Sequence, residues 1–414
     1  MEKYRDSVFE FIRKITKEKD PNKDCGFWIF SPELVIEAIS HFHKAMGPIC
    51  LYYAVKSNPS PYIMQTIFEN YNKEKDGFDC ASINEIKEVI KMGGDPSNIS
   101  YSQIAKTKSE IIEAYNLGVK ITLVDCVEEV EKISQIKDKV KDLKLLIRYQ
   151  SNDPTAEYTL GGKFGADEDE IEIILNSIHK HGLNFAGTHF HIGSAAHNAQ
   201  AFRNGFRIAK ETFDKAKKLG YKPNIIDIGG GFSHHVLIDE FGKVILSAIK
   251  EYGLEDMKVI AEPGRFISSV AFTYVANVIA KHKKVKDNLI YYSLDDGIHG
   301  NMGYCHLFGR LIECIPLNSR NAKKFRSILG GQTCDSHDII CDFQLEELEI
   351  GDWVVFYCFG AYSMCLASNF NGFETRTRPI YQMPTREGKV IKISEELEKK
   401  GIPALWGSPN AWTL

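Results

Sequence analysis

A single lysine follows one of the most strand-like stretches of the chain. In LYYAVKSNPSPY, Lys56 stands directly after an apolar run, and Ser60 with Pro61 is typical of a helix that begins just beyond it. A lysine in such a place is usually a solvated charge. The alternative is a reactive amine, and the residues that end the other apolar runs bear on that choice.

Those other residues form an unusually polar set. They are Asp79, Ser102, Asp125, Arg148, His191, Gly229 to Gly231, and Glu262. Taken singly, an aspartate at a strand end is usually a helix cap, a glycine triplet is usually a turn, and a lone histidine usually lies hydrogen-bonded in a core. These explanations do not account for a cation, carboxylates, an imidazole and glycines that converge on one face.

Eight apolar runs separated by amphipathic segments predict a closed parallel barrel. The runs begin at Ile49, Phe78, Ile99, Ile121, Lys144, Phe185, Asn224 and Lys258. Two of the intervening helices carry capping-box patterns, Ser82 with Glu85 and Thr107 with Glu110. In a TIM-like (β/α)8 barrel the loops after the strands form the functional face, so the polar residues named above are expected to meet there.

The pattern changes after Arg265. Apolar runs such as LIYYSL and WVVFYCF are now separated by Gly, Asn and Pro, and helical periodicity becomes scarce. A chain of 414 residues is long enough for two domains. We therefore expect an α/β protein with a (β/α)8 barrel over residues 28–268, and a β-rich, sandwich-like or barrel-like domain formed by residues 1–27 and 269–414.

The loops after the seventh and eighth strands predict a phosphate site. DIGGGF offers consecutive backbone N–H groups at Gly229, Gly230 and Gly231, and EPGRF adds the guanidinium of Arg265. A phosphate site, a lysine that can form a Schiff base and a carboxylate that can pair with a ring nitrogen are the parts that pyridoxal phosphate (PLP) requires. Lys56 and Glu262 supply the last two, which favours the reactive amine.

Composition excludes several other classes of function. The 51 basic and 55 acidic residues give a net charge of −4, and no basic stripe indicates nucleic acid or a membrane as a partner. The N-terminal segment is charged throughout and lacks an apolar core of signal-peptide length, so we expect a cytoplasmic protein. The ten cysteines are scattered without a CxxC pair, so neither a disulfide framework nor a zinc site is expected, and no other metal.

With these residues the chain resembles the eukaryotic-type ornithine decarboxylases, PLP enzymes of the alanine-racemase-like class that are built from a barrel and a β domain. The resemblance rests on motifs that occur in family order from Tyr53 to Phe373: YAVKSN, FDCAS, HIGS, DIGGGF, EPGR, TCDSHD, GDW, GAYS and NFNGF. It covers most of the chain, and the motifs together are highly specific.

The resemblance implies how the cofactor is held. Lys56 would form the internal aldimine, Glu262 would pair with the pyridine nitrogen, and His191 would stack on the ring face. The implied phosphate ligands are Ser194, Gly229, Gly230, Gly231, Arg265 and Tyr362, and the residues that complete the cofactor's surroundings are Asp79 and Arg148.

The resemblance also implies a homodimer with shared active sites. The partner protomer would supply Cys334, which reprotonates the carbanion left after loss of the carboxylate, and Asp335, which holds the distal ammonium of the substrate. A thiol suits proton donation near neutral pH. Lys163 would pair with Asp338 across the dimer.

Two departures from the family pattern fall on the substrate side. His299, in GIHGNMG, replaces a tyrosine, and Phe308, in HLFGR, stands where the family has a second substrate-binding aspartate. Losing one partner of a desolvated charge pair costs on the order of 2 to 5 kcal/mol. These two positions therefore bear on which substrate is bound and how tightly.

The resulting hypothesis is PLP-dependent decarboxylation of L-ornithine to putrescine and CO2 in polyamine biosynthesis. Two alternatives stay open: decarboxylation of another basic amino acid such as lysine, and a non-catalytic homologue that regulates polyamine synthesis through an antizyme-like protein. A racemase would share the barrel and Lys56, but the TCDSHD run argues against it. Retention of Lys56, Glu262, Cys334 and Asp335 favours an enzyme over the regulator.

Overall fold

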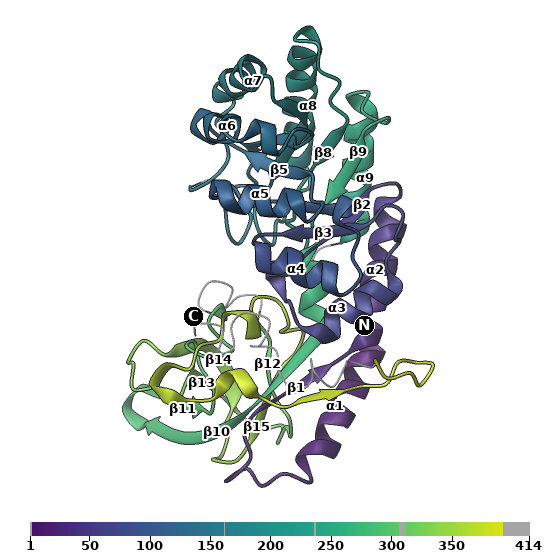
Figure 1. Cartoon of the computed structure of the whole chain (residues 1–414). Coiled ribbons are helices and arrows are strands. Elements are labelled where there is room, and N and C mark those ends of the chain that lie inside the picture. Colours follow the sequence, from purple (N-terminus) through teal and green to yellow (C-terminus); the bar gives the residue numbers. More distant parts are fainter. Residues whose placement is uncertain (1, 161, 236, 306–311, 392–414) are drawn as a thin grey trace. The chain divides into compact units, whose positions relative to one another are not determined.

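The computed structural model describes residues 2–160, 162–235, 237–305 and 312–391 (Figure 1). These residues form two compact units. The unit that we call the barrel unit lies within Ala38–Lys56 and Phe68–Ile267, and the unit that we call the β unit lies within Met1–Glu37, Ser57–Ile67 and Ser268–Leu414.

The barrel unit contains the closed parallel barrel of eight strands that the sequence predicts. The strands are β2 (Cys50–Ala54), β3 (Gly77–Cys80), β4 (Ile99–Tyr101), β5 (Ile121–Val124), β6 (Lys144–Gln150), β7 (Asn184–His191), β8 (Ile225–Asp227) and β9 (Lys258–Ala261). Each pairs with the next along the chain, and β9 closes the ring on β2. Because all the strands are parallel, their carboxyl ends meet at one edge of the barrel.

Helices alternate with these strands and lie outside them (Figure 1). They are α2 (Pro32–Met46), α3 (Pro61–Asn70), α4 (Ile83–Lys91), α5 (Lys108–Asn116), α6 (Val127–Ser134), α7 (Glu170–Lys180), α8 (Ala201–Lys218), α9 (Ile238–Glu251) and α10 (Gly264–Ala271). Helices on one face and a packed interior on the other leave the strands buried on both sides, which is why they read as continuous apolar runs.

The capping box predicted at α5 is present. The hydroxyl of Thr107 accepts a hydrogen bond from the Glu110 N–H (3.2 Å), and the Glu110 carboxylate accepts one from the Thr107 N–H (2.8 Å). At α4 the arrangement differs from the prediction. Ser82 caps the Glu85 N–H (3.2 Å), but the Glu85 carboxylate turns one residue further back and accepts from the Ala81 N–H.

Apolar side chains fill the interior of the barrel. Tyr52, Leu123, Leu146, Ile225 and Ile260 belong to one buried cluster, although they come from five different strands. The barrel is therefore a packed core rather than a pore, and its polar side chains gather at the carboxyl ends of the strands.

The β unit contains a mixed sheet, whose strands are β1 (Phe27–Phe30), β10 (Phe272–Lys284), β11 (Leu289–Leu294), β12 (Cys314–Pro316), β13 (Lys324–Gly330), β14 (Ile339–Glu346), β15 (Trp353–Phe356) and β16 (Ile380–Gln382). Its main order is β12-β15-β10-β11-β13-β14, and β1 joins β10 to β16. Helix α1 (Glu2–Thr16) packs Val8, Phe9 and Ile12 into the core of this sheet. No helix in the described ranges is long and apolar enough to cross a membrane.

The structure draws the domain boundary differently from the expected division at residue 28. Strand β1 pairs with β10 from Phe27–Val275 to Phe30–Phe272, and it also pairs with β16, so residues 28–30 belong to the sheet of the β unit. Residues Ser57–Ile67 also cluster with the β unit. The physical reason for residues 28–30 is strand pairing between segments that are far apart in sequence, and for the second segment it is hydrogen bonding, since the Ser57 carbonyl accepts from the Tyr362 N–H (2.8 Å) and the Asn58 amide donates to the Gly360 carbonyl (2.8 Å).

Candidate functional site

Lys56 lies just after β2, and its ammonium is paired with the buried carboxylate of Asp79 at the end of β3. The two strands are neighbours, and Ala54 is in register with Asp79. The side chain of Lys56 is 41% exposed whereas that of Asp79 is 0% exposed, so the carboxylate holds the amine from beneath while the amine stays accessible. Burial, followed by the nearby Glu262, raises the pKa of Asp79 to about 6, and Lys56 opposes that shift.

Glu262 follows β9 and is held from several sides. Its Oε1 accepts a hydrogen bond from the Ser102 hydroxyl (3.0 Å), and its Oε2 lies 3.6 Å from Nε2 of His189. Burial alone would raise the pKa of Glu262, but His189, Lys56 and His191 together bring that pKa below its ordinary value. The geometry thus favours an ionised carboxylate that can hold a proton on a bound ring nitrogen.

Three further titratable side chains lie at the same end of the barrel: Arg148, Asp227 and His191. Burial lowers the pKa of Arg148, whereas Glu262 and other carboxylates raise it. Burial and Glu262 raise the pKa of Asp227 well above its ordinary value. Burial, followed by Arg148, lowers the pKa of His191 to about 3, so its imidazole is neutral and suited to lie against a ring face.

The glycine loop forms a backbone cradle beside these residues. A Cβ at Gly230 would lie 2.9 Å from both the Glu262 carbonyl and the Nε2 of His191, so only glycine leaves this space open. The Glu262 N–H donates to the Gly229 carbonyl (2.8 Å), which ties the seventh and eighth loops together. Nε of Arg265, in the first turn of α10, donates to the Ser194 hydroxyl (3.3 Å), so two predicted phosphate ligands are in contact.

The β unit brings together a second set of predicted residues. Nε2 of His299 lies 2.7 Å from Oδ2 of Asp335, and the Asp335 Oδ1 accepts from the His337 N–H (2.9 Å). The His337 N–H, and then the His299 hydrogen bond, lower the pKa of Asp335 to about 2, so it is a carboxylate at neutral pH. The adjacent thiol of Cys334 is exposed and contacts Oδ1 of Asn371 at 3.3 Å, which joins the TCDSHD and NFNGF motifs.

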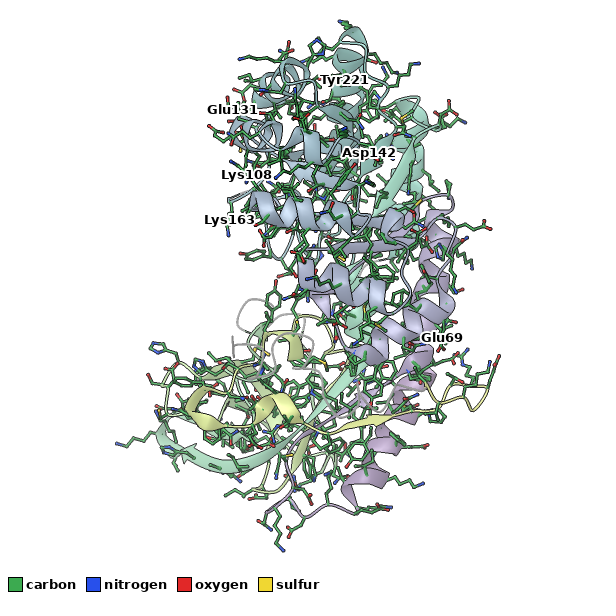
Figure 2. The ribbon with its side chains drawn as sticks, in the orientation of Figure 1. Glu69, Lys108, Glu131, Asp142, Lys163 and Tyr221 are labelled. Atoms are coloured by element: carbon green, nitrogen blue, oxygen red, sulfur yellow. The ribbon has the colours of Figure 1, made fainter. Side chains whose placement is uncertain are left out.

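The remaining predicted residues are dispersed. Tyr362 belongs to the β unit, where its N–H donates to the Ser57 carbonyl (2.8 Å). Asp338 is buried, and its two carboxylate oxygens accept from the Ile298 N–H (2.8 Å) and the Thr333 hydroxyl (2.6 Å). Lys163 lies at the surface of the barrel unit (Figure 2). Phe308 lies outside the described residues.

Some residues of this region have features that the sequence analysis did not predict. His189 is one of them, although its place two residues before His191 on β7 puts it on the same face of the strand. Lys106 is another: it is buried, its ammonium donates to the carbonyls of Ile104 (3.0 Å) and Leu123 (2.9 Å), and burial lowers its pKa to about 8. Asp125 holds the next loop, because its carboxylate accepts from the Gly165 N–H (2.8 Å).

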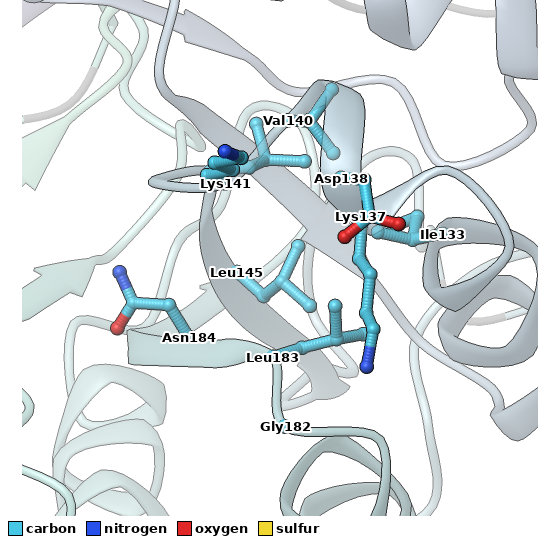
Figure 3. Close-up of a pocket in the computed structure, with 10 residues that line it drawn as sticks. Ile133, Lys137, Asp138, Val140, Lys141, Leu145, Gly182, Leu183 and Asn184 are labelled. Carbon is cyan, nitrogen blue, oxygen red and sulfur yellow. The ribbon is translucent and has the colours of Figure 1, made fainter.

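A pocket on the barrel unit is unrelated to these residues (Figure 3). It is lined by Ile133, Val140, Leu145, Leu183 and Asn184, among others. Asn184 begins β7, so the pocket lies at the amino ends of the strands, opposite the edge that carries Lys56 and Glu262. In TIM-like barrels the edge formed by the amino ends of the strands contributes to stability rather than to chemistry.

Comparisons with known proteins agree with this geometry. The family described as "Pyridoxal-dependent decarboxylase, pyridoxal binding domain" matches residues 33–269. The chain is 34% identical over 388 residues to the chloroplastic ornithine decarboxylase of Nicotiana glutinosa, covering 90% of this chain and 88% of that protein. It is 31% identical over 411 residues to antizyme inhibitor 2 of Xenopus laevis, covering 94% of this chain and 87% of that protein.

Solved structures are similar as well. The arginine decarboxylase of Paramecium bursaria Chlorella virus, bound to agmatine, has a TM-score of 0.82 and 32% identity, covering 91% of this chain and 100% of that one. The family match covers more than half of the chain and coincides with the barrel whose strand ends carry Lys56, Glu262 and the glycine loop. The protein therefore belongs to the pyridoxal-dependent decarboxylases, and its cofactor is pyridoxal 5'-phosphate.

Proposed function

We propose that this enzyme decarboxylates L-ornithine to putrescine and CO2, as a step of polyamine biosynthesis. The substrate class, a basic amino acid, is supported by the relatives that carry the names ornithine and arginine decarboxylase. The choice of ornithine rests on the resemblance of the motifs and on the relative from Nicotiana glutinosa.

The barrel residues fit the cofactor. The space kept open by Gly230, together with the Ser194–Arg265 contact, suits a phosphate group at the end of the cradle. Lys56 offers an accessible amine to anchor the aldehyde, and Glu262 offers a carboxylate for the ring nitrogen. When bound, pyridoxal phosphate supplies the electron sink that takes up the electron pair left as CO2 departs.

The observation that carries the assignment of a basic amino acid as the substrate is the Cys334–Asp335 pair. Asp335 is held as an anion by His337 and His299, which suits it to bind the distal ammonium of a basic amino acid. Cys334, the neighbouring residue, has an exposed thiol that can deliver a proton to the α-carbon. His299 already occupies one oxygen of Asp335, so the substrate amine would bind beside an imidazole.

We further propose that the enzyme is a homodimer in which each protomer completes the other's site. In this arrangement Cys334 and Asp335 come from the partner, and Tyr362 contributes to phosphate binding. Lys163 at the surface of the barrel unit would face the loop that carries Asp338 in the partner. The Asp338 carboxylate is already hydrogen-bonded within its own unit. We therefore expect Lys163 to contact other atoms of the loop that carries Asp338 as well as the carboxylate itself.

The test is a substrate panel with the purified holoenzyme. Ornithine, lysine and arginine are supplied separately, and the released CO2 and the amine product are measured. The control is Cys334→Ala, which lacks the proposed donor of a proton to the α-carbon. We expect ornithine to be the most efficient substrate. A preference for lysine or arginine would overturn the ornithine assignment but keep the reaction. No CO2 from any of the three would overturn both, and would favour a regulator of the antizyme-inhibitor kind.

A further inference from the structure

A buried histidine lies within the barrel directly beneath the cofactor residues. Side chains alternate across β7, and Phe190 points outward, because it packs against Phe206 of α8 with ring centroids 5.9 Å apart. His189 and His191 therefore point into the barrel. In register, His189 is flanked by Arg148 on β6 and by Asp227 on β8.

The His189 imidazole faces carboxylates. Its side chain is 1% exposed, and a ring nitrogen of His189 and one carboxylate oxygen each of Asp227 and Glu262 lie within 4.8 Å of one another. Within the described ranges neither ring nitrogen of His189 has a hydrogen-bond partner, and Nε2 is 3.6 Å from Oε2 of Glu262. Leaving a buried imidazole without a hydrogen bond costs free energy. A proton on Nε2 of His189 would remove this cost by forming a hydrogen bond to Oε2 of Glu262, which needs only a small movement.

The charges around His189 explain why such a donor is useful. Three carboxylates, Asp79, Asp227 and Glu262, share this end of the barrel with two cations, Lys56 and Arg148. Burial lowers the pKa of His189, so the imidazole is neutral, and burial raises the pKa of Asp227, which favours the protonated form of that side chain over its anion. Glu262 is left as the anion, with Ser102 on one oxygen and His189 facing the other.

We propose that His189 is a positioning residue that orients the ionised Glu262 toward the pyridine nitrogen of the cofactor. The proposal rests on the role given to Glu262 in the proposed function. A neutral imidazole N–H on Oε2 and a hydroxyl on Oε1 would fix the plane of the carboxylate and leave a lone pair for the pyridinium proton. His189 would act through Glu262 and would not touch the reacting atoms.

The experiment separates this role from simple packing by changing the cofactor. Apoenzyme is titrated with pyridoxal phosphate and with its analogue in which CH replaces the ring nitrogen, and both dissociation constants are measured. The variants are His189→Gln, whose amide can reach Glu262, and His189→Asn, whose amide is one methylene shorter. Thr188→Val is the control, since Thr188 is buried one residue away and faces the other side of the strand.

We expect His189→Asn to weaken binding of pyridoxal phosphate by about tenfold to a hundredfold, with no change for the analogue. His189→Gln should recover most of the affinity, and adding His189→Asn to Glu262→Gln should cost nothing more. Equal weakening for both ligands, or unchanged affinity for the true cofactor, would overturn the proposal. Failure of the proposed function would look different, because the wild-type protein itself would release no CO2.

Discussion

Among single residues, the proposed reaction assigns different roles to carboxylates that lie in contrasting surroundings. Asp79 is fully buried and has a raised pKa, whereas Asp335 is partly exposed and has a lowered one. The first is suited to hold Lys56 in place, and the second is suited to attract a cation from solvent. In the proposed function, aspartate thus serves the cofactor in one unit, as Asp79, and the substrate in the other, as Asp335.

Asp335→Asn tests the substrate role. Removing the charge should raise the KM for ornithine by roughly thirtyfold to several-thousandfold and change kcat less, because a charged partner of the distal ammonium is lost. The measurement is steady-state kinetics. Asp342→Asn is the matched control, since Asp342 is an exposed carboxylate on β14 that pairs with Arg326 (2.8 Å). A normal KM in Asp335→Asn would rule out this contact.

The sequence predicted much of the cofactor side and less of the substrate side. Lys56, Asp79, Arg148 and Glu262 could be grouped in advance, because the ends of parallel strands must meet at one edge of a barrel. The contact of His299 with Asp335 could not be predicted, since the two residues are 36 positions apart and strands β12 and β13 lie between them in the sequence. His189 was hidden inside an apolar run, where only strand alternation marks it as inward-facing.

At the scale of elements, local signals located the helices and strands but not the pairing of distant strands. Apolar runs predicted all the barrel strands, because a strand buried on both faces is apolar throughout. They did not reveal that β1 pairs with β10, or that β11 and β13 run parallel. The β1–β10 pairing places Phe27, Ile29 and Val275 in one buried cluster with residues of α1, a set of contacts that no short segment encodes.

The carboxylate of Glu85 at the start of α4 makes stability depend on pH. Burial raises the pKa of Glu85 to about 7, although the Ala81 N–H opposes the shift. The folded protein therefore holds a proton that the unfolded chain releases at lower pH, and stability is lost as the pH rises toward 7. Glu85→Gln removes this loss, which amounts to at most about 3 kcal/mol.

The prediction is measured by the midpoint of thermal unfolding at about pH 5 and about pH 8. The difference in midpoint between Glu85→Gln and the wild type should shift in favour of Glu85→Gln when the pH is raised from the lower to the higher value. Glu88→Gln, the same substitution in the same helix at a less buried site, should show no such gain. An equal pH dependence in all three proteins would contradict the assignment of a proton to buried Glu85.

At the scale of the whole molecule, the proposed dimer divides the active site between two chains. The barrel unit holds most of the residues proposed for the cofactor, and the β unit holds Tyr362, Cys334 and Asp335. If the site is shared, an inactive barrel in one protomer and an inactive Cys334 in the other leave one intact site in each mixed dimer.

Co-expression of Lys56→Ala with Cys334→Ala should therefore restore about a quarter of the wild-type activity, because half of randomly assembled dimers are mixed and each has one intact site. Each variant alone should be inactive. The matched control pairs Lys56→Ala with Glu262→Gln: both changes lie in the barrel unit, so no intact site can form. A different affinity tag on each variant shows that mixed dimers have formed. Equal activity of the two co-expressed mixtures would then contradict a shared site.

In the proposed function, Lys56 anchors the cofactor at the carboxyl edge of the barrel. The most direct measurement is reduction of the native holoenzyme with borohydride, followed by peptide mass spectrometry. We expect a pyridoxyl group on the peptide that contains Lys56, and its loss in Lys56→Ala. A pyridoxyl group on buried Lys106, the competing lysine with a pKa of about 8, or on any other lysine in place of Lys56, would contradict the claim.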